Sequence, residues 1–462
     1  MERGNLSRRG FLQRSLAGLV AAGLPAWYAK EILAADKDQP SNERIVMGAI
    51  GIGSPQSRGR AIMQDAMRLP GAEYVAVCDV DKAHRERAVE DVKKAQKDSK
   101  KPESEVKAYE DFRELLDRKD IQAVTIATPE HWHTLVAIDA MRKGKDVYCE
   151  KPLTLTIAEG IALTKVAKDT GRIFQVGSQQ RSDARFRLAC ELVRNGRIGK
   201  VKQVETRIGG NPKSPSLPKV DPPAGLNWDF WLGPTPLVDY VEKKEGNHVF
   251  TRCHYEFRWW YDYSGGKMTD WGAHHNDIAQ WGLGTDEGGP TAVEAEGEEP
   301  SKEPNSYNCH PTFKVTYTYA SGAKLICSNK QLPDSLEKTQ DNGILFVGED
   351  NKWIFVNRST IFASDGDQKA SKLITEPLPK NAKQLYLSTN HMGNFLDGVR
   401  SRKACVCTAD IGHRSVTVCH IGVIALRTGK KLNWDPVKQQ FDDAEANKML
   451  SREMRKPWKL DV

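Results

Sequence analysis

The sequence predicts an α/β fold, with a parallel sheet covered by helices on both faces followed by an α+β domain whose sheet is largely antiparallel. Two observations lead to this prediction. Between residues 44 and 176, short and nearly continuous apolar segments alternate with amphipathic ones, the pattern of a buried parallel sheet. After Gln175 this rhythm gives way to period-two segments separated by turn residues, the pattern of hairpins.

In the first half we predict strands at 45–50, 74–78, 123–127, 147–149 and 173–176, with helices at 59–68, 82–95, 111–117, 134–143 and 157–170. Gly171 follows the last helix, where glycine commonly ends one. The charged stretch 98–105 is expected to be a surface loop.

In the second half a helix at 184–194 precedes a strand at 201–208 and a long proline-rich, aromatic segment, 212–265. Hairpins are predicted at 312–319 with 324–328, and at 344–347 with 352–356. Helices at 391–400 and 412–428 are expected to pack back on the core. The expected division is a signal segment at 1–35, domains at 42–180 and 181–440, and a tail at 441–462.

Composition indicates a soluble globular protein. The chain has 462 residues, of which 39% are hydrophobic and 28% charged, with a formal net charge of +7. The basic residues are scattered and form no stripe with stacking aromatics, so we expect no nucleic-acid partner. The nine cysteines are an odd number without paired spacing and imply no disulfide framework.

The N-terminus predicts export. Ser7-Arg8-Arg9-Gly10-Phe11-Leu12 precedes an apolar run, 16–29, that is too short to span a membrane and matches a twin-arginine secretory signal. We therefore expect a periplasmic protein that crosses the membrane folded. Neither Trp27-Tyr28-Ala29 nor Leu33-Ala34-Ala35 is a good cleavage site, which leaves membrane anchoring by an uncleaved signal open.

Glycines and one acid point to a dinucleotide. Gly51, Gly53 and Gly59 lie between the first strand and the following helix, where glycines let backbone amides approach a pyrophosphate. The loop is longer than the usual G-x-G-x-x-G. Asp79 ends the next strand and matches the acidic partner of an adenosine ribose, so NAD is favoured over NADP.

Other strand ends supply polar groups to the same rim, because ligands bind at the carboxyl ends of parallel strands. Thr128 and Pro129 follow the third predicted strand, and Glu150 and Lys151 follow the fourth. Lys151 is placed to act on a molecule held beside the cofactor. His133 is expected near the nicotinamide ribose, and a metal site at the His131-x-His133 pair is the less favoured alternative.

A second cluster, Asp270 with His274, suggests acid–base chemistry. In a continuous helix the two residues lie one turn apart, and a carboxylate beside an imidazole is a general-base arrangement. A structural histidine, or a metal site that includes His275, is the alternative. No metal is predicted.

Aromatic and polar residues suggest where a sugar binds. Trp228 and Arg258 lie in aromatic stretches that suit sugar rings, although core packing explains many such residues equally well. Gln179 and Arg181 lie at the predicted domain junction. With His275, these are the predicted substrate-binding residues.

Taken in order, Gly51 and Gly53, Asp79, Ala127-Thr128-Pro129, Glu150-Lys151-Pro152 and Asp270 with His274 resemble the Gfo/Idh/MocA family. The resemblance runs from about residue 45 to beyond 435. Trp228 to Pro234, His391-x-x-Asn394-Phe395 and His413-Arg414-Ser415 resemble an exported subgroup with a twin-arginine signal.

The family resemblance implies a Rossmann domain, an α+β domain with a large, mostly antiparallel open-faced sheet, and a homo-oligomer (dimer or tetramer). It also implies a tightly held NAD(P) and a sugar, polyol or keto-sugar substrate. By the same resemblance, Lys151 is the catalytic lysine, His274 the acid/base, and Asp270 its orienting partner.

The sequence therefore predicts an NAD-dependent dehydrogenase acting on CH–OH groups. Two alternatives stay open: an NAD-dependent glycosidase that acts by transient oxidation and elimination, and a non-catalytic sugar-binding member of the fold. The sequence leaves open whether Lys151 or His274 is the formal base.

Overall fold

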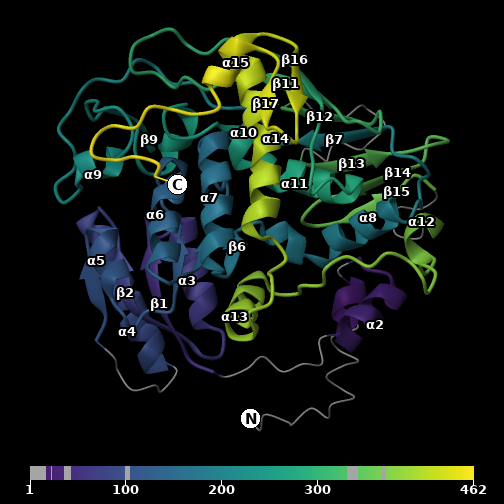
Figure 1. Ribbon diagram of the computed structural model, residues 1–462, viewed down its shortest axis with the longest axis horizontal. Helices are drawn as coiled ribbons and strands as arrows, with labels where there is room; N and C mark the ends of the chain where they lie inside the picture. Colours follow the sequence, from purple (N-terminus) through teal and green to yellow (C-terminus); the bar gives the residue numbers. More distant parts are fainter. Residues whose placement is uncertain are drawn as a thin grey trace.

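The computed structural model describes residues 17–21, 23–35, 43–98, 105–329, 342–365 and 371–461. Two sheets, of six and nine strands, organise these residues (Figure 1). The first sheet lies at the lower left of Figure 1 and the second at the right, with α14 (Ala409–Thr428) between them. The predicted twin-arginine motif, 7–12, and most of the predicted loop at 98–105 fall outside the described residues.

The first sheet is entirely parallel, as predicted, with the order β3-β2-β1-β4-β5-β6. Its strands are β1 (Ile45–Ile50), β2 (Ala72–Cys78), β3 (Lys107–Tyr109), β4 (Ala123–Ile126), β5 (Asp146–Cys149) and β6 (Phe174–Val176). Strand β3 was not predicted because its three residues are exposed or half-buried and give no apolar signal. This strand order is that of a Rossmann domain.

Helices connect these strands: α3 (Arg58–Met67), α4 (Lys82–Asp98), α5 (Phe112–Asp117), α6 (Glu130–Arg142) and α7 (Ile157–Thr170). Helix α6 begins four residues earlier than predicted, directly after Pro129, whose fixed φ suits a helix start. Helix α7 begins with a capping box between Thr156 and Glu159 and ends at Gly171, whose φ is 60°.

The second sheet has the order β15-β14-β13-β7-β12-β11-β10-β16-β17. Its strands are β7 (Gln203–Arg207), β10 (Ala292–Gly297), β11 (Phe313–Thr318), β12 (Lys324–Ser328), β13 (Gly343–Val347), β14 (Trp353–Val356), β15 (Ile361–Ala363), β16 (Leu432–Asp435) and β17 (Gln440–Phe441). Only the β7–β12 pair is parallel, so the prediction of a mostly antiparallel sheet is confirmed, and both predicted hairpins are present.

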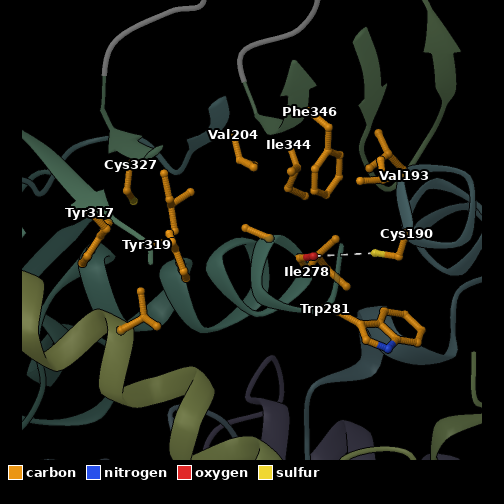
Figure 2. Close-up of a cluster of buried hydrophobic side chains, with 14 of the residues drawn as sticks. Cys190, Val193, Val204, Ile278, Trp281, Tyr317, Tyr319, Cys327, Ile344 and Phe346 are labelled. Atoms are coloured by element: carbon orange, nitrogen blue, oxygen red, sulfur yellow. Dashed lines mark hydrogen bonds between the residues drawn. The ribbon is translucent and has the colours of Figure 1, made fainter. Parts of the chain in front are cut away.

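One face of the second sheet packs on α8 (Ala184–Arg194), α11 (Gly272–Leu283) and α14. Figure 2 shows part of this core, in which Ile344 and Phe346 of β13 lie above α11 and Trp281 of α11 lies on the opposite side of that helix. Cys190 of α8 lies beside them, with its sulfur 3.6 Å from the main-chain oxygen of Ile278. The sheet and its helices therefore share one hydrophobic core.

The C-terminal part of the chain returns to both domains. Helix α13 (His391–Ser401) packs Met392, Phe395 and Leu396 into the cluster that holds Ile45 and Met47 of β1, so it completes the Rossmann core. The chain also forms two short helices, α12 (Lys372–Thr375) and α15 (Ala444–Lys448), and the 3-10 turn η1 (Gln179–Ser182).

The segment after the predicted signal motif is part of the fold. Helix α2 (Ala26–Ala35) buries Tyr28 completely against the second domain, where its hydroxyl accepts a hydrogen bond from Arg187 Nη1 at 3.0 Å. Both stretches considered as cleavage sites include residues of this helix. In the part of the chain that the structure describes, none of the helices is both long and apolar enough to cross a membrane.

The aromatic segment 212–265 forms its own cluster and closes over the Rossmann domain. It contains α9 (Trp228–Leu232), β8 (Glu242–Glu245), β9 (His248–Thr251) and η2 (His254–Trp259), and it leads into α10 (Lys267–Asp270). Its backbone reaches the end of β2, where Lys82 N donates to Gly225 O at 3.0 Å and Asn227 N to Val80 O at 3.1 Å. These hydrogen bonds hold the segment against the carboxyl edge of the parallel sheet, where residues of η2 line the cavity described below.

Candidate active site

A cavity of about 1000 Å³ lies at the carboxyl ends of the parallel strands, beneath the aromatic segment. All of the predicted cofactor and catalytic residues line it, namely Gly51, Gly53, Gly59, Asp79, Thr128, Pro129, His133, Glu150, Lys151, Asp270 and His274. Gln179 and Arg258, predicted to bind substrate, line it as well. The volume is in the range of known small-molecule sites.

The glycine loop is held so close to β4 that no side chain fits. A Cβ on Gly51 would lie 2.5 Å from Thr128 N, and one on Gly59 would lie 2.1 Å from Gly51 O. Gly51 and Gly53 also have left-handed φ angles, 77° and 71°. These glycines leave a bare backbone surface at the cavity wall, as phosphate binding requires.

Asp79 binds the backbone of this loop. Its Oδ2 accepts hydrogen bonds from Ile52 N at 2.9 Å and Gly53 N at 2.8 Å, and its Oδ1 accepts one from Asp81 N at 2.9 Å. Burial raises the pKa of Asp79, but nearby His84 and the backbone N–H groups outweigh burial and hold that pKa below its usual value. The carboxylate is therefore ionised at the cavity wall.

His84 lies between two carboxylates, with Nδ1 3.7 Å from Asp79 Oδ1 and Nε2 3.8 Å from Asp81 Oδ2. Burial lowers the pKa of His84, but these carboxylates raise it above its usual value. Among the described residues, Asp81, His84 and His254 form the one group of three or more metal-ligand side chains whose ligand atoms all lie within 4.8 Å of one another.

The two histidines of the His131-x-His133 pair bind different carbonyl groups. His131 Nε2 lies 2.9 Å from Trp231 O, and His133 Nδ1 lies 2.8 Å from Pro152 O. Since a carbonyl oxygen only accepts, each of these nitrogens carries the proton. Burial lowers the pKa of His133 to about 4, so its ring is neutral and Nε2 has a free lone pair.

Two buried polar atoms at the wall lack a partner. His133 Nε2 and Thr128 Oγ1 make no hydrogen bond with any residue that the structure describes. Buried polar groups are normally paired, so these atoms are fitted to a ligand with polar groups of its own. Together with the glycine surface, they fit a dinucleotide in this cavity.

Lys151 and Asp270 form an ion pair inside the cavity. Lys151 Nζ donates to Asp270 Oδ1 at 2.7 Å and to the main-chain oxygen of Asp270 at 2.9 Å. Arg258 Nε lies 3.7 Å from the same Oδ1. Burial raises the pKa of Asp270, but the cations Lys151 and Arg258 hold it well below its usual value.

The predicted pairing of Asp270 with His274 is therefore wrong. Helix α10 ends at Asp270 and α11 begins at Gly272, so the continuous helix behind the prediction is interrupted at Trp271. The buried carboxylate binds the lysine ammonium because a full opposite charge stabilises it more than a neutral imidazole does.

His274 lines the cavity as a neutral base. It is 7% exposed, and its Nδ1 has no hydrogen-bond partner among the described residues. Burial, together with the positive charges of Lys151 and Arg358, holds the pKa of His274 well below its usual value. The imidazole is thus uncharged at neutral pH and has a nitrogen able to accept a proton.

Glu150 and Gln179 brace the end of β5. Gln179 Nε2 donates to Glu150 Oε1 at 2.8 Å and to Tyr148 Oη at 3.0 Å. Arg58 Nε, at the start of α3, donates to Glu150 Oε1 at 3.2 Å. This network ties the glycine-loop helix to the strand that carries Lys151.

Three predicted substrate-binding residues do not line the cavity. Arg181 is 1% exposed and pairs with Asp277 and Asp286 at 2.7 and 2.8 Å. His275 is fully buried, because adjacent residues of a helix point in different directions. Trp228 stacks on Trp231 in the aromatic cluster.

The cavity also contains residues that were not predicted, including Arg58, Glu130, Trp231 and Arg358. Glu130 follows Thr128-Pro129 directly, so the same strand-end reasoning had the signal to find it. Arg358 lies in the turn between β14 and β15, and the sequence gives no local sign that this turn reaches the Rossmann domain.

Glu130 is a buried carboxyl group with one free oxygen. Oε1 accepts a hydrogen bond from Ser264 Oγ at 3.0 Å, whereas Oε2 has no partner among the described residues. Burial raises the pKa of Glu130 to about 7, although the charge of Arg258 lowers it. The folded protein therefore binds a proton here at pH values where the unfolded chain has released it.

We expect Glu130→Gln to stabilise the protein at alkaline pH. The raised pKa makes wild-type stability fall as pH rises from about 4.5 to about 7, by on the order of 3 kcal/mol. The variant lacks this fall, so its advantage in unfolding free energy should grow between about pH 5 and pH 8. Denaturant unfolding measures it. The exposed Glu86→Gln is the control, and a pH-independent difference would contradict the expectation.

Comparison with known proteins places both halves of the chain in one family. A model described as "Oxidoreductase family, NAD-binding Rossmann fold" matches residues 45–178. A second, described as "Oxidoreductase family, C-terminal alpha/beta domain", matches residues 213–460, more than half of the chain.

Relatives and solved structures agree with this fold. An alpha-N-acetylgalactosaminidase from Shewanella oneidensis is 32% identical over 212 residues, which are 43% of this chain and only 44% of that protein. The aldose-aldose oxidoreductase from Caulobacter crescentus, solved with glycerol, is 19% identical, with a TM-score of 0.57 over 85% of this chain and 100% of that one. The WlbA dehydrogenase from Bordetella pertussis, solved with NADH and UDP-GlcNAcA, is 16% identical, with a TM-score of 0.58 over 85% and 99%.

Proposed function

The chain belongs to the Gfo/Idh/MocA oxidoreductase family, and on this basis we propose that it is an NAD-dependent oxidoreductase acting on a hydroxyl-bearing carbon of a sugar, polyol or keto-sugar. The Lys151–Asp270 ion pair, with His274 on the wall of the same cavity, is the observation that carries the proposal. These groups lie at the carboxyl end of β5, where ligands bind in such sheets.

NAD, when bound, supplies the acceptor for the hydride that leaves the substrate carbon. The neutral His274 accepts the hydroxyl proton on a ring nitrogen. Lys151 Nζ has three donors and spends two of them on Asp270, so one remains for the substrate oxygen as it becomes a carbonyl. Asp270 holds the Lys151 ammonium in place. This role replaces the predicted one, in which Asp270 oriented the imidazole of His274.

We assign the cofactor to the wall built by the glycine loop and the ends of β2 and β4. Gly51, Gly53 and Gly59 offer backbone to the pyrophosphate, and Asp79 offers a carboxylate to the adenosine ribose. Thr128 and His133 offer the unpartnered Oγ1 and Nε2 atoms to the nicotinamide half. An ionised Asp79 repels a 2′-phosphate, which supports NAD over NADP.

Asp79→Ser should shift the cofactor preference towards NADP. Removing the charge ends the repulsion of a 2′-phosphate, and we expect the NADP-to-NAD affinity ratio to rise at least about tenfold. Titration of the cofactor-free protein with each nucleotide measures this ratio. Asp117→Ser, which removes an exposed carboxylate from the end of α5, is the control for net charge. Tighter NADP than NAD binding by the wild type would refute the assignment of Asp79.

A second candidate is an NAD-dependent glycosidase, because the Shewanella relative is named as a glycosidase and is 32% identical in the matched region. Such an enzyme would oxidise one ring carbon to a ketone by passing a hydride to NAD, and would then eliminate the aglycone to leave a double bond. Water would add to that double bond, and the ketone would take the hydride back from the reduced nicotinamide. His274 and Lys151 would play the same parts in its first step, the oxidation, so the cavity suits both candidates.

The deciding experiment begins with the purified protein and whatever nicotinamide it carries. Sugars, polyols and glycosides are supplied, and both the absorbance of reduced nicotinamide and the products are followed. A dehydrogenase gives a keto product with matching reduction, whereas a glycosidase releases aglycone without lasting reduction. Absence of bound or bindable nicotinamide, or of any turnover, would favour the non-catalytic alternative.

A further inference from the structure

Arg358 brings a positive charge into the cavity, and the carboxylates that it interacts with, Asp270 and Asp183, lie beyond ion-pair distance. It lies in the turn between β14 and β15, where Asn357 Oδ1 accepts hydrogen bonds from Ser359 N and Thr360 N at 2.9 Å each. The side chain lines the cavity with His274 and Trp271. None of the carboxylates in the described parts of the chain forms an ion pair with it.

The guanidinium is nevertheless fixed in position. Its carbon lies 4.7 Å from the centre of the Trp271 ring. With its amide turned so that both of its atoms find partners, Gln180 donates to His274 O at 2.9 Å and accepts from Arg358 Nε at 3.2 Å. Arginine has five N–H donors, so the four on Nη1 and Nη2 remain for another partner. An arginine held by stacking and one neutral contact is arranged to bind an anion.

The rest of the substrate end is also short of negative charge. The Asp270 carboxylate interacts with Lys151, Arg258 and Lys267, and more weakly with Arg358. Of the other cavity cations, Arg58 pairs with Glu150 and Arg185 with Asp183. The charges of these last two pairs cancel. Glu130, which interacts with Arg258 and has a pKa raised to about 7, offsets only part of the positive charge that remains around Asp270. Burial and the charge of Arg58 lower the pKa of Arg358, so the site carries a cost that a bound anion would relieve.

Building on the proposed function, we infer that the substrate is a sugar with an anionic oxygen group, a carboxylate or a sulfate ester, and that Arg358 binds this group. Arg358 and His274 share Gln180 and Trp271 as neighbours, so the anion lies beside the carbon that reacts. Arg358 is then a specificity residue and takes no part in proton transfer.

The test compares binding by wild-type holoprotein, Arg358→Gln and Arg358→Lys. The ligands are glucuronate, glucose 6-sulfate and glucose, and binding is followed by calorimetry. The wild type should bind one anionic sugar about 10- to 100-fold more tightly than glucose, the range for a charged hydrogen bond. Arg358→Gln should bring the affinity ratio of anionic sugar to glucose down to about one, while Arg358→Lys should keep part of the preference. The two anionic arms distinguish a carboxylate from a sulfate.

Lys352→Gln is the matched control. Lys352 directly precedes β14, at the opposite end of that strand from Arg358, and does not line the cavity. Equal binding of anionic and neutral sugars by the wild type would overturn the inference, as would absence of sugar binding. Release of bound nicotinamide by Arg358→Gln would overturn it too, because Arg358 would then serve the cofactor phosphates. Anion preference without any reduction of nicotinamide would instead refute only the proposed function.

Discussion

Lys151→Ala is expected to lower sugar-dependent reduction of nicotinamide by at least about two orders of magnitude, the usual cost of losing a donor that stabilises charge developing on a reacting oxygen. The variant loses the ammonium that stabilises the substrate oxygen and leaves Asp270 with Arg258 as its nearest cation. Bound nicotinamide should be retained, because the glycine loop is untouched. Steady-state kinetics and the nicotinamide content of the purified variant measure both effects.

The exposed Lys165→Ala on α7 is the control for this variant, since that lysine pairs only with Asp169 at the surface. Near-normal turnover by Lys151→Ala would remove the site assignment and the dehydrogenase proposal with it.

A double-mutant cycle tests the corrected role of Asp270. If Asp270 positions Lys151, Asp270→Asn should slow turnover in the wild type and add little in the Lys151→Ala background, because groups that act as a unit are not additive. If Asp270 instead positioned His274, Asp270→Asn should lower kcat further in the Lys151→Ala background and have little effect in the His274→Ala background. The two patterns are opposite, so kcat values of the four proteins in each cycle separate them.

His274→Ala should also cost at least about two orders of magnitude in turnover, because the neutral ring is the proposed acceptor of the hydroxyl proton. Its pKa lies well below the usual value, so the wild-type rate should stay level through neutral pH and fall only below the usual histidine range. If the residual rate of His274→Ala no longer falls at low pH, the fall seen in the wild type is due to protonation of this ring.

His248→Ala, on the exposed β8–β9 hairpin, is the control, and it should leave the rate and its pH dependence unchanged. A wild-type rate that fell steeply between about pH 7 and pH 6 would contradict the low pKa of His274, because a base with an ordinary histidine pKa loses activity there.

Local sequence signals were sufficient for much of the cofactor wall. The glycines at 51, 53 and 59, the acid at 79 and the Thr128-Pro129 pair are each read from a strand end, and parallel strands bring their carboxyl ends to one edge without further information. All of them line the cavity. The hairpin turn at Asp350 and Asn351, whose φ angles are 53° and 56°, is likewise a local feature.

The direction of a side chain was harder to predict. Arg181, Trp228 and His275 lie close in sequence to residues that do line the cavity, but each points into packed protein. A shift of one residue along a helix turns the side chain by more than a quarter of a turn. An error of one residue in the predicted orientation of a helix therefore places a core side chain in the cavity.

The sequence by itself determined the fold class, the glycine wall and the place of Lys151 at a strand end, because periodicity and strand-end motifs depend on neighbouring residues. The family resemblance, and no local pattern, joined Asp270 and His274 to Lys151 in one predicted site. Only the tertiary structure decided which charges meet. Lys151 and Asp270 are 119 residues apart, and Arg358 reaches the cavity from a turn of the second sheet. Coulomb attraction and burial depend on distance in space, which no local pattern encodes.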